Sequence, residues 1–289
     1  MNIGIIGLGL IGASLAKAWK EKGHTAFGYD INNKTMSFAK EQNILDYELC
    51  NNNYNKLDVL VIALYPRAFE SALNNALPYL KEGTIVLDIG GIKKSVVAAM
   101  EKASIAYPNI KFVATHPMAG KESWGITHSC KKLFEGASIL MTNVNANIKD
   151  IELIKSLFLE IGAINITKTS AKVHDEMIAY TSQLAHLISS SYIKSPLAAR
   201  HDGYSAGSFC DLTRVAKLNA DMWTELIIDN RENVIKELDV FISNVMSYRS
   251  ALQNGDEQKL KELLKEGNDK KEEIERATKE WKRIRNENN

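Results

Sequence analysis

The chain opens with the run Asn2-Ile3-Gly4-Ile5-Ile6-Gly7-Leu8-Gly9-Leu10-Ile11-Gly12, and this run sets the architecture of its first half. Residues 2–6 form a β-branched run typical of a buried strand, and residues 13–22 read as a helix that Gly23 can stop. Glycines therefore stand between a strand and a helix. Gly7 permits a tight turn, Gly9 lets a ligand approach the backbone, and Gly12 lets the helix pack close to the strand.

An acidic residue completes this pattern. Asp30 follows the next predicted strand, residues 26–29, and stands 18 residues after Gly12. Its carboxylate can accept hydrogen bonds from both ribose hydroxyls of a dinucleotide and would repel a 2′-phosphate, while the helix N-terminus suits the pyrophosphate. A glycine-rich turn without a ligand is the alternative. The pattern predicts a site that prefers NAD to NADP, formed by Gly7, Leu8, Gly9, Leu10, Ile11, Gly12 and Asp30.

Strands and helices alternate to about residue 170. Strands are predicted at 57–63, 84–88, 111–114 and 138–141, and helices at 69–80, 95–103 and 148–161. This alternation predicts an α/β fold with a Rossmann-type, doubly wound, mostly parallel sheet. Leu64 and the pair Gly90-Gly91 follow two of the strands where a bound dinucleotide would lie, although a plain turn explains the glycines equally well.

The run Thr115-His116-Pro117-Met118-Ala119-Gly120 follows the predicted strand at 111–114. His116 should therefore lie at the carboxyl edge of the sheet, where open α/β sheets bind ligands. An imidazole there can exchange a proton near neutral pH, and Pro117 and Gly120 would hold it in a turn. The competing interpretation is a histidine that only caps a loop.

From residue 171 onward the pattern is helical, with no clear strands. A single helix over 173–191 would place Asp175, Ser182 and His186 on one buried face, because they are seven and four residues apart. A histidine on an apolar face is often a satisfied core residue. Three polar side chains on the same face make a ligand contact an equally good interpretation.

The next predicted helix is entered through a segment that contains Gly207 and carries Asp211 and Arg214. The two charges could form an ion pair within the helix, or the guanidinium could bind a substrate carboxylate. Residues 256–289 are dominated by charge and predict one or two amphipathic helices, with Leu260, Leu263, Leu264, Ile274, Trp281 and Ile284 as their apolar side. An apolar stripe for the core or a dimer interface, with one polar member that needs a partner, is formed by Trp223, Ile227, Asn230, Val234, Leu238 and Phe241.

The composition is that of an ordinary globular protein, and its length favours two domains. The 289 residues are 45% hydrophobic and 25% charged with a formal net charge of +1, so we expect no nucleic-acid or membrane partner. The three cysteines are far apart, and the N-terminal run lacks the basic segment of a signal peptide, which favours a cytoplasmic protein. The histidines are scattered, so no metal site is predicted.

Four blocks of sequence resemble the prephenate dehydrogenases of tyrosine biosynthesis and their close relatives, the arogenate dehydrogenases. They occur in the order expected for that family and span about residues 3–235. The first block is common to many nucleotide-binding enzymes, whereas the other three together are specific. The blocks are the glycine run with Asp30; Thr115 to Gly120 with Leu133-Phe134-Glu135-Gly136; His174-Asp175 leading to Ser182-Gln183-Leu184-Ala185-His186; and Asp211-Leu212-Thr213-Arg214 with Trp223 and Asn230.

The resemblance implies an NAD-binding Rossmann domain over residues 1–170 and an all-helical, substrate-binding and dimerisation domain over residues 171–289. It implies oxidation of the ring carbinol of prephenate by hydride transfer to NAD, with loss of the ring carboxylate as carbon dioxide to give 4-hydroxyphenylpyruvate. The expected partners are a small-molecule substrate, prephenate or arogenate, and a second copy of the chain. His116 would take the hydroxyl proton, Arg214 would bind a substrate carboxylate, and His186, Ser182 and Gly207 would line the substrate pocket.

The sequence departs from the family pattern at Gly91, where many members have a serine that contacts the cofactor and the substrate hydroxyl. A second hydrogen bond to that hydroxyl would then come from Ser123, Thr115 or water. Gln183 and Ala185 also replace a common histidine and proline, which leaves substrate preference and tyrosine inhibition open.

Two other functions compete with this assignment. A β-hydroxyacid-type dehydrogenase would carry a lysine on the first long helix after the nucleotide domain, and the helix predicted at 173–191 has none. A non-catalytic NAD sensor would not need His116 and Arg214 at the cleft.

Overall fold

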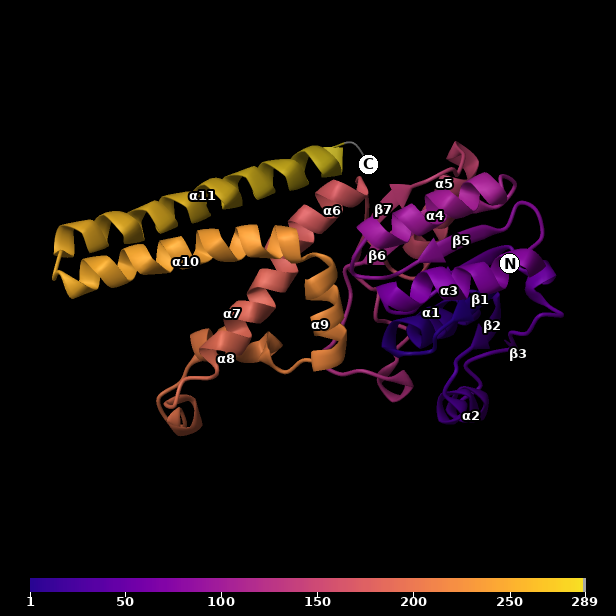
Figure 1. Ribbon diagram of the computed structural model, residues 1–289, viewed down its shortest axis with the longest axis horizontal. Helices are drawn as coiled ribbons and strands as arrows, with labels where there is room; N and C mark the ends of the chain where they lie inside the picture. Colours follow the sequence, from indigo (N-terminus) through magenta and orange to yellow (C-terminus); the bar gives the residue numbers. More distant parts are fainter. Residues whose placement is uncertain (288–289) are drawn as a thin grey trace. The chain divides into compact units, whose positions relative to one another are not determined.

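The computed structural model describes residues 1–287, with side chains described through residue 279. The chain forms two compact units, residues 1–234 and 235–289. The first unit contains an eight-stranded sheet, the helices that cover it and a following helical segment (Figure 1).

The glycine-rich run connects strand β1 (Asn2–Ile6) to helix α1 (Leu10–Glu21), as predicted. Gly7 has a φ of 93°, and a Cβ at this position would lie 2.4 Å from the carbonyl oxygen of Ala63. A Cβ on Gly12 would lie 2.0 Å from the carbonyl oxygen of Gly7. Neither position accepts a side chain, and this allows α1 to start close against the sheet.

The strand order is β3-β2-β1-β4-β5-β6-β7-β8. The chain leaves β1 through β2 and β3 on one side and crosses back to β4 on the other, and strands β1 to β6 all pair in parallel. This confirms the doubly wound sheet that the alternating pattern predicted. The remaining strands are β2 (Thr25–Tyr29), β3 (Tyr47–Glu48), β4 (Val59–Ile62), β5 (Ile85–Asp88), β6 (Lys111–Pro117), β7 (Ser138–Asn143) and β8 (Asn165–Lys168).

Strand β7 runs antiparallel to β6, with His116 opposite Leu140. The two strands are joined by a segment that contains one short 3₁₀ helix, η3 (Ile126–His128), and no crossover α-helix. Because a parallel pair needs such a crossover, this connection returns the chain in the opposite direction. The prediction of a mostly parallel sheet holds, with this one pair as the exception.

Helices cover both faces of the sheet. On one face, the Trp19 indole of α1 donates a hydrogen bond of 2.7 Å to the carbonyl of Leu157 and packs against Phe158. On the other face, Phe69 and Leu73 share a buried cluster with Met100. The helices of this part are α2 (Asn33–Glu41), α3 (Pro66–Ala76), α4 (Lys94–Ala106) and α5 (Ile148–Glu160), with the short 3₁₀ helices η1 (Tyr54–Lys56) and η2 (Leu77–Tyr79).

The helix predicted at 173–191 is a continuous rod from residue 171 to residue 192 (Figure 1). It consists of α6 (Ala171–Ile178), a π-helical segment η4 (Ala179–Leu184) and α7 (Ala185–Tyr192). Because the rod starts earlier than predicted, its first turn includes Lys172. The side chain of Lys172 is 84% exposed and lies 4.0 Å from Glu176, so it is a surface residue and not a buried active-site lysine.

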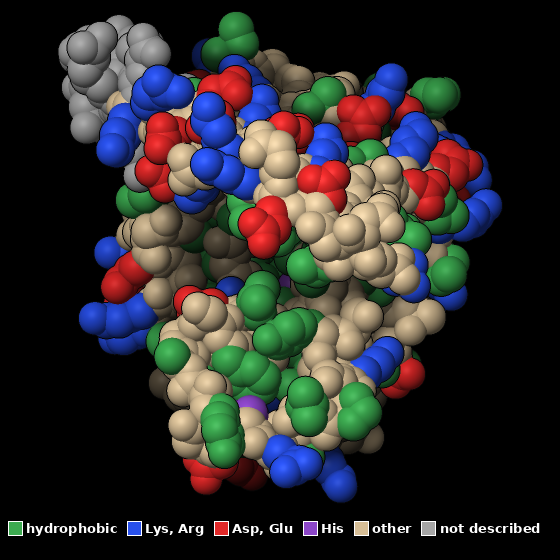
Figure 2. Space-filling model, turned by 90° about the vertical axis from the view of Figure 1, so that its left-hand side faces the viewer, with side chains coloured by type: hydrophobic (Ala, Val, Ile, Leu, Met, Phe, Trp, Pro, Cys, Tyr) green, Lys and Arg blue, Asp and Glu red, His purple; other side chains and the backbone are tan. Residues whose placement is uncertain are grey.

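After this rod the chain forms shorter helices. They are η5 (Ala198–Arg200), α8 (Gly207–Thr213), η6 (Arg214–Ala216) and α9 (Ala220–Asp229). Hydrophobic side chains gather in the lower part of Figure 2, where the segment from the end of α7 to η6 lies, and its exposed members are Tyr192, Leu197, Tyr204 and Leu212.

Helix α10 (Arg231–Gln253) begins in the first unit, and the second unit continues it and adds α11 (Glu257–Glu287). The hydroxyl of Tyr248 donates to the carbonyl of Leu263, which joins the two helices. The predicted charged tail is thus a single long helix, while Trp281 and Ile284 lie outside the residues whose side chains are described. Within the described part of the chain, no helix is both long and apolar enough to cross a membrane.

Candidate active site

His116 is the penultimate residue of β6, at the carboxyl edge of the parallel strands. The sequence placed it in a turn after a strand ending at residue 114, whereas the strand continues to Pro117 and pairs with β7. Sheet pairing therefore fixes its backbone. Thr115 is fully buried and its hydroxyl donates to the carbonyl of Asp88, so the expectation that Thr115 could bond a substrate hydroxyl is wrong.

A chain of hydrogen bonds runs from His116 into the helical segment. His116 Nδ1 lies 2.9 Å from His174 Nε2, and His174 Nδ1 lies 2.7 Å from Asp175 Oδ1. The carboxylate of Asp175 also accepts two backbone N–H groups at the start of α4, from Lys93 at 2.8 Å and Lys94 at 2.9 Å. His174 and Asp175 are 1% and 3% exposed. The sequence had assigned no role to His174, although its adjacency to a buried acid was a usable signal.

A buried lysine, Lys93, lies next to this chain of hydrogen bonds. Lys93 is 1% exposed, and its ammonium donates to Asp88 Oδ2 at 2.5 Å and to the carbonyl of Gly90 at 2.6 Å. The other oxygen of Asp88 accepts the backbone N–H of Thr115 at 2.8 Å. Asp88 thus ties the end of β5 to the end of β6, next to His116. This pair was not predicted, because a lysine two residues after Gly91 gives no sign of burial in the sequence.

The charges around the site determine its protonation. Burial lowers the pKa of His116 well below its usual range, and the positive charge of Lys93 lowers that pKa further. Burial also lowers the pKa of His174, an effect that the hydrogen bond to Asp175 opposes. Burial raises the pKa of Asp88, against the attraction of Lys93. Both imidazoles are therefore neutral at pH 7, and His116 can accept a proton.

The glycine loop offers an anion site beside Asp30. No side chain caps the start of α1, whose N-cap residue is Gly9, so its first backbone N–H groups remain free for a ligand. A Cβ on Gly9 would meet no atom within 4 Å, which leaves the backbone open to close approach. Asp30 Oδ2 accepts the N–H of Leu8 at 2.8 Å and Oδ1 accepts that of Asn32 at 2.9 Å, so the carboxylate is held against the loop.

Gly91 faces both His116 and α9. A Cβ at Gly91 would lie 3.4 Å from Leu226 Cδ2 and 4.0 Å from His116 Cε1. Gly90 precedes it and donates its N–H to Asp88 at 2.9 Å. Leu64 follows β4 and is half-buried against the core, at the same edge of the sheet.

Arg214 forms its ion pair with Glu122 and not with Asp211, the partner that the sequence suggested. Its guanidinium donates to Glu122, in the segment after β6, and not to Asp211. The interpretation as an ion pair within one helix is therefore wrong. The Arg214 side chain is 65% exposed, so the guanidinium remains accessible to a carboxylate from solution.

His186 lies in the first turn of α7 and stacks on Trp223 of α9, with ring centroids 3.6 Å apart. Its Nδ1 lies 2.9 Å from the carbonyl oxygen of Ser182. Because a carbonyl only accepts, Nδ1 carries the hydrogen and the lone pair of Nε2 is left for a ligand. Ser182 itself is half-buried in the π-helical segment, and Gly207 is exposed at the start of α8.

Asn230 is the polar member of the apolar stripe, and its buried side chain has the hydrogen-bond partners that it needs. Its amide donates to the carbonyl of Asp175 at 2.8 Å and to Gln183 Oε1 at 2.7 Å. Gln183 in turn donates to the carbonyl of Leu226 at 2.8 Å. Gln183 thus joins α9 to the π-helical segment.

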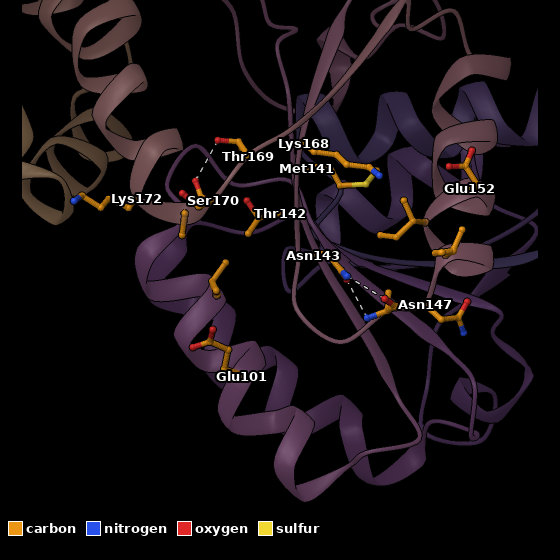
Figure 3. A pocket seen from close by; sticks show the side chains of 15 residues that line it. Glu101, Met141, Thr142, Asn143, Asn147, Glu152, Lys168, Thr169, Ser170 and Lys172 are labelled. Atoms are coloured by element: carbon orange, nitrogen blue, oxygen red, sulfur yellow. Dashed lines mark hydrogen bonds between the residues drawn. The ribbon is translucent and has the colours of Figure 1, made fainter.

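A cavity of about 630 Å³ lies elsewhere, at the ends of β7 and β8 (Figure 3). It is lined by residues of α4, β7, α5 and the start of α6, and by the residues that cap α5 and α6, Asn147 and Ser170. None of the predicted site residues lines it. Within the part of the chain that the structure describes, no group of three or more His, Cys, Asp or Glu residues could hold a metal ion.

Two family models match the chain. Residues 15–167 match "Prephenate dehydrogenase, nucleotide-binding domain", and residues 170–266 match "Prephenate dehydrogenase, dimerization domain". A cyclohexadienyl dehydrogenase of Zymomonas mobilis is 30% identical over 280 residues, covering 92% of this chain and 93% of the relative. A prephenate dehydrogenase of Lactococcus lactis is 27% identical over 275 residues, covering 91% of this chain and 74% of the relative.

Among solved structures, the prephenate dehydrogenase from A. aeolicus in complex with hydroxyphenyl propionate and NAD+ is similar in fold. It superposes with a TM-score of 0.82 at 27% identity, over 95% of this chain and 98% of that chain.

Proposed function

Because the chain belongs to the prephenate dehydrogenase family, we propose that it catalyses the NAD-dependent oxidative decarboxylation of prephenate to 4-hydroxyphenylpyruvate. The observation that carries this proposal is the neutral, half-buried His116 at the carboxyl edge of the nucleotide-binding sheet. A base is needed there because oxidation of a carbinol removes its hydroxyl proton as the hydride leaves.

The residues at the first strand fit NAD. The free N–H groups at the start of α1 would bind the pyrophosphate, the open space at Gly9 admits it, and Asp30 would accept the ribose hydroxyls. The relative from A. aeolicus was solved with NAD+, which supports the same cofactor here. When bound, NAD supplies the hydride acceptor. Leu64, Gly90 and Gly91 lie at the same edge of the sheet, and we propose that they face the nicotinamide end of the cofactor.

The chain's own residues would carry out the remaining work. His116 would accept the hydroxyl proton at Nε2. Arg214 would exchange its contact with Glu122 for a substrate carboxylate, which its exposure permits. His186, held by Trp223 and Ser182, would present its Nε2 lone pair to the substrate, and Gly207 would line the same pocket. Decarboxylation restores the aromatic ring, so the protein mainly has to orient a dianion and remove one proton.

We also propose a homodimer formed through the helical part of the chain. The match to a dimerization domain and the exposed apolar side chains between α7 and η6 support it. The corresponding domain boundary would fall near residue 170, dividing residues 1–170 from residues 171–289. The last strand ends at Lys168, and the two family matches meet between residues 167 and 170. We place the enzyme in the cytoplasm, where reducing conditions keep its cysteines free.

The test is NADH or NADPH formation, followed by absorbance, with prephenate and with arogenate as substrates. Prephenate oxidation with NAD is the expected result. Preferential oxidation of arogenate would make the protein an arogenate dehydrogenase, and inactivity towards both despite NAD binding would refute the proposal. His116→Asn should lower turnover far more than it weakens NAD binding, because the base is removed while the glycine loop is unchanged.

A further inference from the structure

We propose that His174 and Asp175 form a positioning pair that fixes His116 in its base form and receives a proton from it during the reaction. The second half of this inference rests on the proposed function. Neither residue is accessible to solvent, since both are buried beside His116. Their contribution is made through the imidazole of His116.

The hydrogen-bond partners determine which ring nitrogens carry hydrogen. Both oxygens of Asp175 accept backbone N–H groups from the start of α4, so the carboxylate is an acceptor on both sides. His174 Nδ1, at 2.7 Å from Asp175, must then carry a hydrogen, and its Nε2 bears the lone pair. That lone pair can accept only a hydrogen from His116 Nδ1, at 2.9 Å. His116 is therefore left with its lone pair on Nε2.

The surrounding charges make His174 a better site for a proton than His116. Lys93 lies close enough to disfavour a positive charge on either imidazole, and Asp88 partly neutralises Lys93. Asp175 hydrogen-bonds directly to His174, whereas His116 has no carboxylate among its described hydrogen-bond partners. A proton that stays on His116 would thus lie near Lys93 with no carboxylate hydrogen-bonded to its own ring. A proton moved to His174 would be paired with Asp175.

The transfer balances without any further reactant. The substrate hydroxyl gives its proton to His116 Nε2, and its O–H electron pair becomes part of the new carbonyl as the carbinol hydride leaves for NAD. His116 Nδ1 gives its own proton to His174 Nε2. His174 Nδ1 keeps its hydrogen, which stays hydrogen-bonded to Asp175. The pair therefore ends as a His174 imidazolium beside the Asp175 carboxylate.

The first measurement is nitrogen NMR of the full-length protein labelled with ¹⁵N-histidine, with NAD bound and at neutral pH. Both His116 and His174 should show a protonated Nδ1 and an unprotonated Nε2. The resonances are assigned by their loss in His116→Asn and His174→Gln. Finding the hydrogen on His116 Nε2 would overturn the positioning role, and this readout does not depend on enzyme activity.

The second measurement separates positioning from proton transfer. In His174→Gln, the amide oxygen can still accept from His116 Nδ1 but cannot take its proton, so we expect kcat to fall about tenfold with KM and NAD affinity unchanged. In His174→Phe both functions are lost, and kcat should fall about 10²–10³-fold. The matched control is His24→Gln, a histidine hydrogen-bonded to Glu160 before the start of β2, which should keep the wild-type kcat.

Each result decides a different question. Wild-type kcat in His174→Phe would overturn the inference and leave the proposed function intact. Equal losses of kcat and NAD affinity in His174→Gln would overturn it in favour of a purely structural histidine. A wild-type protein that is inactive on both substrates would overturn the proposed function and the proton transfer, while the NMR result would still decide the tautomer of His116.

Discussion

Replacing Asp30 by alanine should change the cofactor preference of the enzyme. A carboxylate has about four lone-pair sites. The N–H groups of Leu8 and Asn32 use one on each oxygen, which leaves one on each oxygen for a ribose hydroxyl. A hydrogen bond to a charged group contributes about 1.5–3 kcal/mol, and the lower figure suits a half-exposed side chain.

Losing two such bonds amounts to about 3 kcal/mol, or about 10²-fold in kcat/KM for NAD. The value for NADP should not fall in parallel, because Asp30→Ala also removes the charge that repels the 2′-phosphate. The ratio of kcat/KM for NAD to that for NADP, from NADH and NADPH absorbance, should therefore drop by at least about 10².

The matched control for this change is Asp46→Ala. Asp46 also accepts a backbone N–H at 2.8 Å, but from Ala26 near the start of β2, at the opposite end of that strand from Asp30. The cofactor ratio should stay at the wild-type value in this variant. If Asp30→Ala folded normally and kept the wild-type ratio, the assignment of Asp30 to the ribose would be refuted.

Four other outcomes follow from the contacts of the site. The acid limb of kcat/KM should lie below pH 6.5, because burial and Lys93 lower the pKa of His116; an inflection at or above 6.5 would contradict this. His116 and His174 bind protons more weakly in the folded than in the unfolded chain. The stability they contribute is therefore present above pH 6.5 and is lost as the pH falls. In urea titrations, the free energy of unfolding should fall by at most about 1.4 kcal/mol per proton per pH unit. Arg214→Ala should raise KM with little change in kcat, whereas an unchanged KM would assign Arg214 to its contact with Glu122 alone. Asn230→Ala should lower the free energy of unfolding by about 2–3 kcal/mol because two buried acceptors lose their donor; a loss below about 1 kcal/mol would show that water replaces it.

The central strands and their helices could be predicted from sequence because they bury continuous apolar runs. Strand β1 was predicted with its observed ends, and β5 and α5 were predicted to within one residue. The edge strands β3 and β8 and the polar helix α2 were missed. They bury little apolar surface, so their patterns carry almost no periodic signal.

The site could be predicted only in part, for a different reason. Local motifs indicate the glycine loop, Asp30 and His116 as candidate site residues, because each of them follows or ends a strand that the sequence predicts. The contacts of His174 with His116 and of Lys93 with Asp175 join residues 58 and 82 positions apart. The break in the helix at Asn230 was also missed, since the apolar spacing runs through it without interruption. Such pairings follow from the packing of α6 on the sheet, which no local pattern specifies.

The π-helical segment at residues 179–184 limits which length changes this region can accept. A π turn closes one residue later than an α turn, so the segment holds one residue more than an α-helix needs for the same rotation. Deleting a single residue there would let the rod become α-helical throughout, with the faces of α6 and α7 nearly unchanged. His186 would stay against Trp223, and His174 and Asp175 would stay against His116. Inserting a residue has no such release and would rotate α7 by about 100° relative to α6. The region can thus lose one residue, whereas gaining one would separate the part of the helix beside the proposed base from the part beside the proposed substrate site.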